Sequence, residues 1–109
     1  MQITRYRGDT SADEFSIYNN TTGAPANLTG SSLVLTVNSV LNPTDVSQQL
    51  FQMVGVVADP PSGVVEFVPS TLQANNIGTY YFDIQLTDNA GVIRTLVKDV
   101  YEFVQDITK

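Results

Sequence analysis

Acidic side chains concentrated in the last quarter of the sequence are the first residues that could do chemistry. Carboxylates coordinate calcium, and a pair of them can hydrolyse a glycosidic bond. No calcium-loop pattern of the form D-x-[DN]-x-[DN]-G accompanies them, and the Thr and Gln residues nearby are typical of a solvated strand face. The sequence therefore predicts a polar outer face, with a surface calcium or a polar subunit contact as the alternative. The residues concerned are Asp83, Asp88, Asp99, Glu102 and Asp106.

The absence of two residue types narrows the chemistry further. The chain contains no cysteine and no histidine, so it has no thiolate nucleophile, no imidazole base and no common transition-metal ligand. Any catalysis would have to run on carboxylates, Lys or Tyr. We therefore expect no catalytic residues, no metal site and no cofactor, and the chain is not predicted to be an enzyme.

Charge and hydropathy argue against two classes of partner. The net charge is -6, and the 5 Lys and Arg residues form no run, whereas phosphate binding needs clustered cations. We expect no nucleic-acid partner and no membrane partner. The N-terminus has no apolar signal-peptide core, and no apolar run approaches the roughly 20 residues that span a bilayer. The sequence predicts a soluble protein that an ordinary signal does not export.

Two kinds of short motif have simple structural explanations. The tripeptide R-G-D at residues 7–9 is used by some extracellular ligands to engage integrins, but a turn that reverses the chain at Gly8 also explains it. Three N-x-[ST] matches would matter only in a secretory pathway, and they begin at Asn19, Asn20 and Asn27. We interpret the tripeptide as a turn and the three matches as coincidence in an Asn- and Thr-rich chain.

Aromatic residues near the end of the chain could form a platform for a sugar ring. They are Tyr80, Tyr81, Tyr101 and Phe103. The alternation of side chains places Tyr80 inside and Tyr81 outside, which favours core packing with one surface tyrosine over a binding platform.

Alternating apolar and polar side chains predict strands along the whole chain. The clearest strand is 79–87, because its apolar side chains recur with the period of two that is typical of a half-buried strand. A turn at 88–91 follows, in which we expect Gly91 to adopt a positive φ and close a hairpin with 92–104. Edge strands are expected at 3–6 and 14–18, a central strand at 32–41, a strand at 64–68, and at most one short helical turn near 70–77.

Two segments carry apolar side chains on both faces. Residues 49–58 are expected to form one strand that pairs with 64–68, and its second face lies either under a loop or against another subunit. In the return strand 92–104 the alternation slips near Lys98 and Asp99, which indicates a bulge or kink there.

About seven short strands separated by turn signals predict an all-β fold. With 109 residues the chain can hold one core, so 1–109 is expected to be a single domain. The predicted architecture is an immunoglobulin-like two-sheet antiparallel β-sandwich, although the Cys-Trp-Cys signature of antibody domains is absent.

The order of seven sequence pieces resembles that of small structural domains of tailed bacteriophages. The pieces are R-G-D-T, P-x-N-L-T-G, G-x-V-x-F, G-x-Y-x-x-D-I, D-x-x-G, R-T-L and D-I-T, at 7–10, 25–30, 63–67, 78–84, 88–91, 94–96 and 106–108. In particular, the chain resembles the N-terminal immunoglobulin-like domain of upper baseplate and tail-fibre attachment proteins.

This resemblance implies a virion structural protein that acts through protein–protein contacts in the baseplate, the tail or a fibre attachment. It implies other virion proteins and copies of the chain itself as partners, several copies per particle, and assembly in the host cytoplasm. Such relatives usually continue beyond this region, so a sequence that stops at Lys109 suggests a free-standing adaptor or decoration subunit. The alternatives are a capsid-surface decoration protein and a carbohydrate- or receptor-binding β-sandwich module. The expected subunit interface comprises Met53, Val54, Val56, Tyr101 and Phe103.

Overall fold

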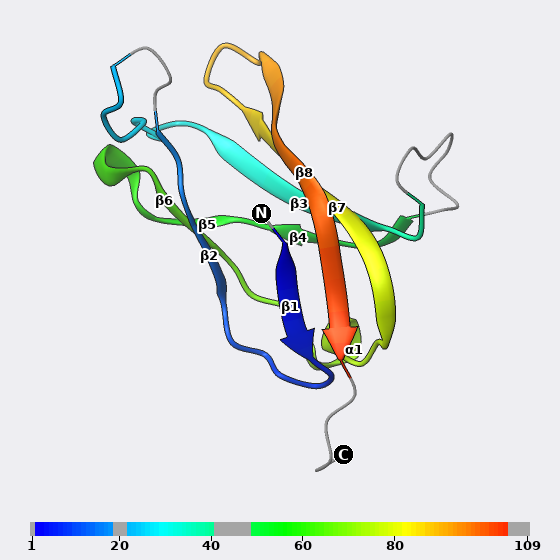
Figure 1. The fold of residues 1–109 in the computed structure, drawn as a ribbon. Coiled ribbons are helices and arrows are strands. Elements are labelled where there is room, and N and C mark those ends of the chain that lie inside the picture. Colours follow the sequence, from blue (N-terminus) through cyan, green and yellow to red (C-terminus); the bar gives the residue numbers. More distant parts are fainter. Residues whose placement is uncertain (1, 19–21, 41–48, 105–109) are drawn as a thin grey trace.

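The computed structural model describes residues 2–18, 22–40 and 49–104, which form two β-sheets packed against each other (Figure 1). The larger sheet has the strand order β1-β8-β7-β3-β4, and the smaller sheet has the order β2-β6-β5. This all-β sandwich confirms the predicted fold class. The strands are β1 (Ile3–Tyr6), β2 (Asp13–Ser16), β3 (Ser32–Asn38), β4 (Gln49–Val54), β5 (Val56–Asp59), β6 (Val64–Phe67), β7 (Gly78–Thr87) and β8 (Ile93–Val104).

The central strands form where the sequence alternates most clearly. β3 pairs with β7 over seven residues and with β4 on its other side. Leu33, Leu35 and Val37 of β3 are fully buried, as are Phe82 and Ile84 of β7. Their alternate neighbours point outward, so strand period and burial agree.

One contiguous hydrophobic core fills the space between the sheets. Its aromatic rings meet mostly edge to face, an arrangement that adds to the benefit of burying them. Both sheets contribute, which is why neither is stable as a separate layer. The core residues are Phe15, Leu28, Leu33, Leu35, Val37, Met53, Val65, Phe67, Phe82, Ile84, Tyr101 and Phe103.

The turn between β7 and β8 follows the prediction from its sequence. Gly91 has a φ of 84°, and the Oδ1 atom of Asp88 accepts hydrogen bonds from the backbone N–H groups of Ala90 and Val92 at 2.9 and 3.0 Å. The side chain of Asp88 is therefore a structural part of the turn, as expected for Asp at the start of a tight reversal.

The segment 49–58 departs from the single strand predicted for it. The chain leaves the larger sheet after β4, passes through Gly55 and enters the smaller sheet as β5. Only β5 pairs with β6, whereas β4 pairs with β3. Apolar residues continue through the crossing, so their pattern does not reveal where the chain changes sheets.

Gly55 makes this crossing fit against the core. A Cβ atom at this position would lie 2.7 Å from Cγ2 of Val65 and 3.0 Å from Cε1 of Phe67. The Gly55 N–H also donates a 2.8 Å hydrogen bond to the carbonyl of Leu33, which ties the crossing to β3. A glycine here lets the backbone approach the core closely.

We predict that Gly55→Ala lowers the free energy of unfolding by about 1–3 kcal/mol, because the added methyl overpacks the core. Urea unfolding followed by circular dichroism measures the change. Ser32→Ala, at an exposed strand position, serves as the control and is expected to stay within about 0.5 kcal/mol of the wild type. Equal stability of Gly55→Ala and the wild type would show that the crossing has room for a side chain.

A β-bulge interrupts the pairing of β7 with β8. Ile84 faces Val97 and Gln85 faces Thr95, so Leu96 is the extra residue on β8. The predicted irregularity is therefore present, but it lies two residues before Lys98. It exchanges the faces of β8, so Tyr101 and Phe103 point into the core although Ile93, on the same parity before the bulge, is exposed.

The pairing of β1 with β8 is parallel, whereas the sequence predicted a purely antiparallel sandwich. Ile3 lies opposite Tyr101 and Tyr6 lies opposite Val104. β1 and β2 are edge strands of different sheets, which confirms their predicted edge positions. A pairing between strands so far apart in sequence leaves no local signal.

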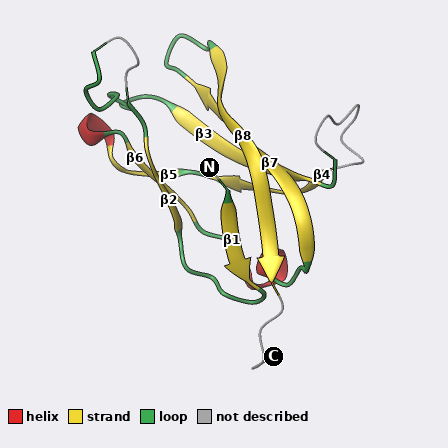
Figure 2. Cartoon of the chain, in the orientation of Figure 1, coloured by secondary structure: helices red, strands yellow, loops and turns green. Residues whose placement is uncertain are grey.

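A short helix, α1 (Thr71–Ala74), lies within the predicted helical turn (Figure 2). Ser70 caps it, and Gln73 completes a capping box with the Ser70 backbone. The Nε2 atom of Gln73 donates a 3.1 Å hydrogen bond to the carbonyl of Gln52 on the edge strand β4. The 3-10 turn η2 (Pro60–Ser62) joins β5 to β6.

Some expectations fall on residues 1, 19–21, 41–48 and 105–109, outside the described parts of the chain. They are the N-x-[ST] matches at Asn19 and Asn20, the last residue of the strand expected at 32–41, Asp106 and the D-I-T motif. No helix among the described residues has the length and hydropathy needed to cross a bilayer.

Candidate functional site

Three of the five residues predicted for a subunit interface lie in the core. Met53 is 3% exposed, Tyr101 is fully buried and Phe103 is 2% exposed. They contact the interior of their own domain, so they offer no surface to another subunit. In the sequence, the apolar residues at the end of β8 exceeded what one buried face needs, because the bulge at Leu96 changes which residues of the strand point inward.

The other two predicted interface residues, Val54 and Val56, are exposed. Val54 is 73% exposed and Val56 is 61% exposed. They flank Gly55 at the crossing from β4 to β5, where Gly55 faces the core and both valines face outward. No loop in the described part of the chain covers them, which favours the subunit contact over the loop for this second face.

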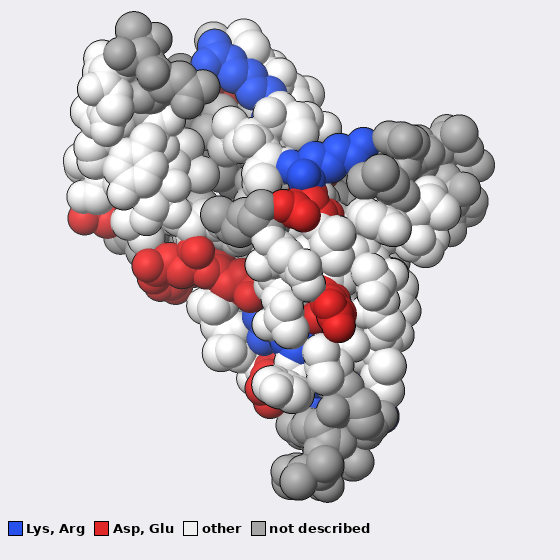
Figure 3. Space-filling view, in the orientation of Figure 1, with Lys and Arg blue, Asp and Glu red and all other residues white. Residues whose placement is uncertain are grey.

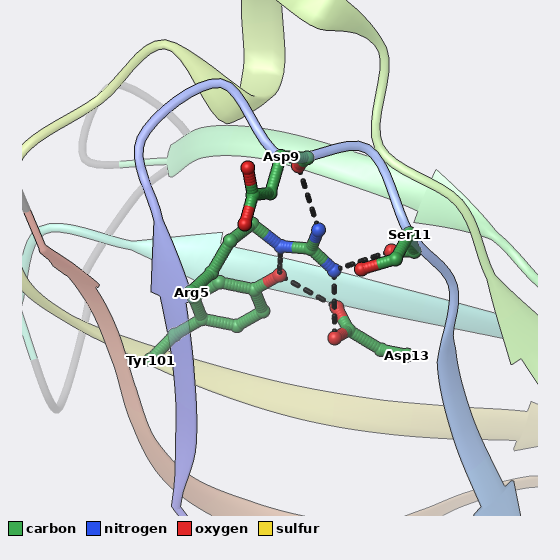
Figure 4. A network of polar contacts seen from close by, with 5 residues as sticks. All are labelled: Arg5, Asp9, Ser11, Asp13 and Tyr101. Carbon is green, nitrogen blue, oxygen red and sulfur yellow. Dashed lines mark hydrogen bonds and ion pairs between the residues drawn. The ribbon is translucent and has the colours of Figure 1, made fainter. Parts of the chain in front are cut away.

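A polar network that the sequence analysis missed lies at the edge of the core (Figure 4). The Arg5 Nε atom donates a 2.9 Å hydrogen bond to the Tyr101 hydroxyl, and that hydroxyl donates a 2.6 Å hydrogen bond to Oδ2 of Asp13. The Arg5 guanidinium also forms a 2.7 Å ion pair with Oδ1 of Asp13. Its remaining contacts are to the carbonyls of Asp9 at 2.7 Å and Ser11 at 2.8 Å.

This network joins the two sheets at one end of the sandwich. Arg5 on β1 and Tyr101 on β8 belong to the larger sheet, and Asp13 begins β2 of the smaller one. Arg5 is only 5% exposed, and a buried cation is tolerated only where it is paired and hydrogen-bonded. No buried side-chain polar atom in the described residues lacks a partner. We conclude that the network has a structural role and holds the two sheets together.

Protonation in the network favours this structural role over acid–base chemistry. Burial raises the pKa of Tyr101, and the hydrogen bond to Asp13 raises it further. Burial lowers the pKa of Arg5, but its hydrogen bonds with Tyr101 and Asp13 outweigh that effect and leave the pKa raised. Both groups therefore keep their protons at neutral pH.

One signal could have identified Arg5 from the sequence. Positions 3 and 5 share a face of β1, and the apolar Ile3 packs against the core. An arginine on the same inward face needs a buried carboxylate.

We predict that the network is lost at alkaline pH. Below the ordinary tyrosine pKa of about 10 both states hold the Tyr101 proton, whereas above it the unfolded chain loses this proton first. The free energy of unfolding should therefore fall by up to about 1.4 kcal/mol per pH unit above pH 10. Denaturant unfolding of Tyr101→Phe should show a smaller fall, and Tyr18→Phe, at an exposed tyrosine, should behave like the wild type. Equal slopes for wild type and Tyr101→Phe would contradict the prediction.

The acidic residues considered for chemistry do not converge. No group of three or more acidic side chains in the described residues could hold a metal ion. Asp88 is engaged in its turn, and Asp83 faces Lys98 across β7 and β8. Burial raises the pKa of Asp83, and the charge of Lys98 opposes this rise.

The R-G-D tripeptide is a turn, as predicted. Gly8 has a φ of 87°, the Asp9 N–H donates to the carbonyl of Tyr6, and the Gly8 N–H donates to the carbonyl of Ala74. The Asp9 carbonyl accepts from Arg5, so this turn also serves the network.

The aromatic platform considered for a sugar is not present on the surface. Tyr101 and Phe103 are buried and stack on each other, and Tyr80 packs edge to face against Phe103. This leaves Tyr81 on the opposite face of β7, which agrees with the inside and outside positions predicted for Tyr80 and Tyr81.

Comparison with known proteins rests on the fold. No protein-family model and no curated protein matches the chain. The chain has the fold of the N-terminal domain of phage TP901-1 ORF48. The two structures superpose with a TM-score of 0.59 at 14% sequence identity, and the match covers 97% of this chain and 85% of that one. The resemblance to a tailed-phage domain, indicated by the order of motifs, is thus confirmed at the level of the fold.

Proposed function

We propose that the chain is a bacteriophage virion structural protein of the baseplate, the tail or a fibre attachment. The single observation that carries the proposal is the fold it shares, over nearly its whole length, with a domain of a phage protein. In this role the protein binds other virion proteins through its surface and carries out no reaction. Its place is the particle, which assembles in the host cytoplasm.

The surface offers support that is independent of the fold. Val54 and Val56 are large apolar side chains exposed beside each other in the chain, and exposed apolar patches commonly mark sites of protein contact. An assembly protein needs such a surface, whereas an enzyme needs a cleft with converging polar groups.

The test is the composition of purified particles of the phage that encodes the chain. Quantitative mass spectrometry should find the protein at a fixed, multi-copy ratio to the major tail proteins, and immunogold labelling should place it on the tail or baseplate. Labelling spread over the capsid shell would favour the decoration protein instead. Absence from purified particles would refute the virion role.

A further inference from the structure

The hairpin between β7 and β8 forms an arm that projects from the sandwich (Figure 1). Every residue from 89 to 96 is exposed, although residues 93–96 belong to a strand. The arm carries the apolar side chains of Val92, Ile93 and Leu96, and Ile93 is 63% exposed. Apolar residues on both faces of a projecting hairpin are not explained by packing within the domain.

The arm also presents a strand edge. Among the described residues, β8 pairs with β1 only from Tyr101 onward, so its stretch from Ile93 to Val100 pairs with β7 alone. Exposed strand edges are templates for pairing with another chain, and proteins that do not use them usually shield them. Peptide and protein partners commonly bind by adding a strand at such an edge.

The second exposed apolar site lies where β4, at the opposite edge of the larger sheet, crosses into β5 of the smaller sheet. We call it the β4–β5 corner, and it comprises Val54, Val56, Asp59 and Glu66. Val54 lies opposite Val34, which lies opposite Gln85, which lies opposite Thr95. Val54 of the corner and Thr95 at the base of the arm therefore occupy one row of the larger sheet, on opposite sides of it.

The two edges differ in charge. The arm, residues 89–96, bears Arg94 as its one charged side chain, in a chain with only 5 Lys and Arg residues. Figure 3 shows basic side chains at the upper end of this face, where the arm projects, and acidic ones mostly below. At the corner Val56 lies opposite Glu66, which in turn lies opposite Glu14. Like charges directly opposite each other destabilise a sheet unless a cation approaches them.

We propose that the arm of one copy docks on the β4–β5 corner of a second copy. The arm and the corner lie on opposite sides of the larger sheet, so they cannot meet within a single copy. Their charges are complementary, whereas two arms would bring Arg94 against Arg94, and two corners would bring Glu66 against Glu66. The arm presents a strand edge, and β4 and β5 at the corner are edge strands, so the docking can extend a sheet from one copy to the next.

A contact of this kind is heterologous, because different surfaces of the two copies meet. Heterologous contacts form a ring if the rotation closes and an open filament if it does not. The inference goes beyond the proposed function, since it names the contact between copies. Self-association in solution tests it separately from the composition of particles.

Sedimentation velocity on the full chain, up to about 1 mM protein, is the first measurement. We expect association that grows with concentration and weakens as ionic strength rises from about 0.1 M to about 1 M, because salt screens the complementary charges. A wild type that remains monomeric throughout, or whose association strengthens with salt, would overturn the proposal.

Two substitutions separate the sites. Ile93→Asp should disable the arm and Val56→Asp the corner, each raising the self-association Kd at least about tenfold, as loss of a central apolar contact does. A mixture of the two variants should form a 1:1 complex, because the intact arm of Val56→Asp fits the intact corner of Ile93→Asp. If the mixture stays monomeric, or if either variant alone associates like the wild type, the proposal fails.

Two further variants test whether a loss of association is specific to the arm and the corner. Arg94→Glu, a surface change that should leave the far-ultraviolet circular dichroism spectrum unchanged, is expected to weaken association at least about fivefold. Tyr6→Asp, at a 55% exposed side chain near the other end of β8, should associate like the wild type. An unchanged Kd for Arg94→Glu, or an equal loss for Tyr6→Asp, would contradict docking through these two edges.

Discussion

Arg5→Met is expected to lower the free energy of unfolding by about 3–5 kcal/mol, the largest effect of any substitution considered. The methionine keeps the apolar stem of the side chain but removes every donor of the guanidinium. Asp13 would then lose its ion pair in a poorly solvated site, with the Tyr101 hydroxyl as its remaining partner in the network. The carbonyls of Asp9 and Ser11 would also lose their donor. An uncompensated buried charge is what makes the loss large.

Equilibrium unfolding in urea measures this loss, with Arg94→Met as the matched control. Arg94 is exposed on the arm, so its replacement should change stability by no more than about 0.5 kcal/mol. The double variant Arg5→Met with Asp13→Leu should recover part of the loss, because no charge remains buried. A cost below about 1 kcal/mol for Arg5→Met would show that the network contributes little to stability.

Gly63→Ala is expected to lower the free energy of unfolding by about 2–4 kcal/mol, for two reasons that add. Gly63 has a φ of 71°, a backbone conformation that is strained for residues other than glycine. A Cβ atom would also press against the carbonyl oxygen of Ile17 and lie 2.9 Å from that of Ala26. The backbone of Ile17 and Ala26 cannot move away easily, because it is held by two hydrogen bonds. The Ile17 N–H donates to the Gly63 carbonyl, and the Ala26 N–H donates to the Ile17 carbonyl.

The chain offers a control that separates strain from steric contact. Gly23 has almost the same φ of 72°, but a Cβ atom there would meet nothing within 4 Å. Gly23→Ala should therefore show the backbone strain alone, about 1–2 kcal/mol. If thermal and urea unfolding give the two alanine variants equal stability, the close contact at Gly63 has no energetic effect.

Local patterns in the sequence predicted the elements whose physics is local. The alternation of 79–87 predicted β7 and its buried face, and the D-x-x-G turn predicted the positive φ of Gly91. The capped turn at α1 was found from its Ser and Thr residues. In each case the signal and the structure it forms lie within about ten residues, so neighbours along the chain contain the necessary information.

The sequence was less informative where distant residues decide the structure. Gly55 separates two strands of different sheets, and only its fit against Val65 and Phe67 shows why a glycine is needed. Tyr101 was predicted to lie in a subunit interface because its hydrogen-bond partner Arg5 is 96 residues away and gives no local signal. Of the five residues predicted for an interface, Val54 and Val56 are therefore exposed, whereas Met53, Tyr101 and Phe103 are buried in the core.

The parallel pairing of β1 with β8 also constrains when the protein can fold. The first strand of the sandwich pairs with its last, so β1 has no sheet partner until β8 has been synthesised. This raises the contact order, and β-sandwiches of high contact order fold in milliseconds to seconds rather than microseconds. During that interval β1 is an unpaired strand, and newly made copies at high local concentration risk pairing it with the wrong molecule. Co-translational folding should therefore finish, rather than begin, with the burial of Arg5.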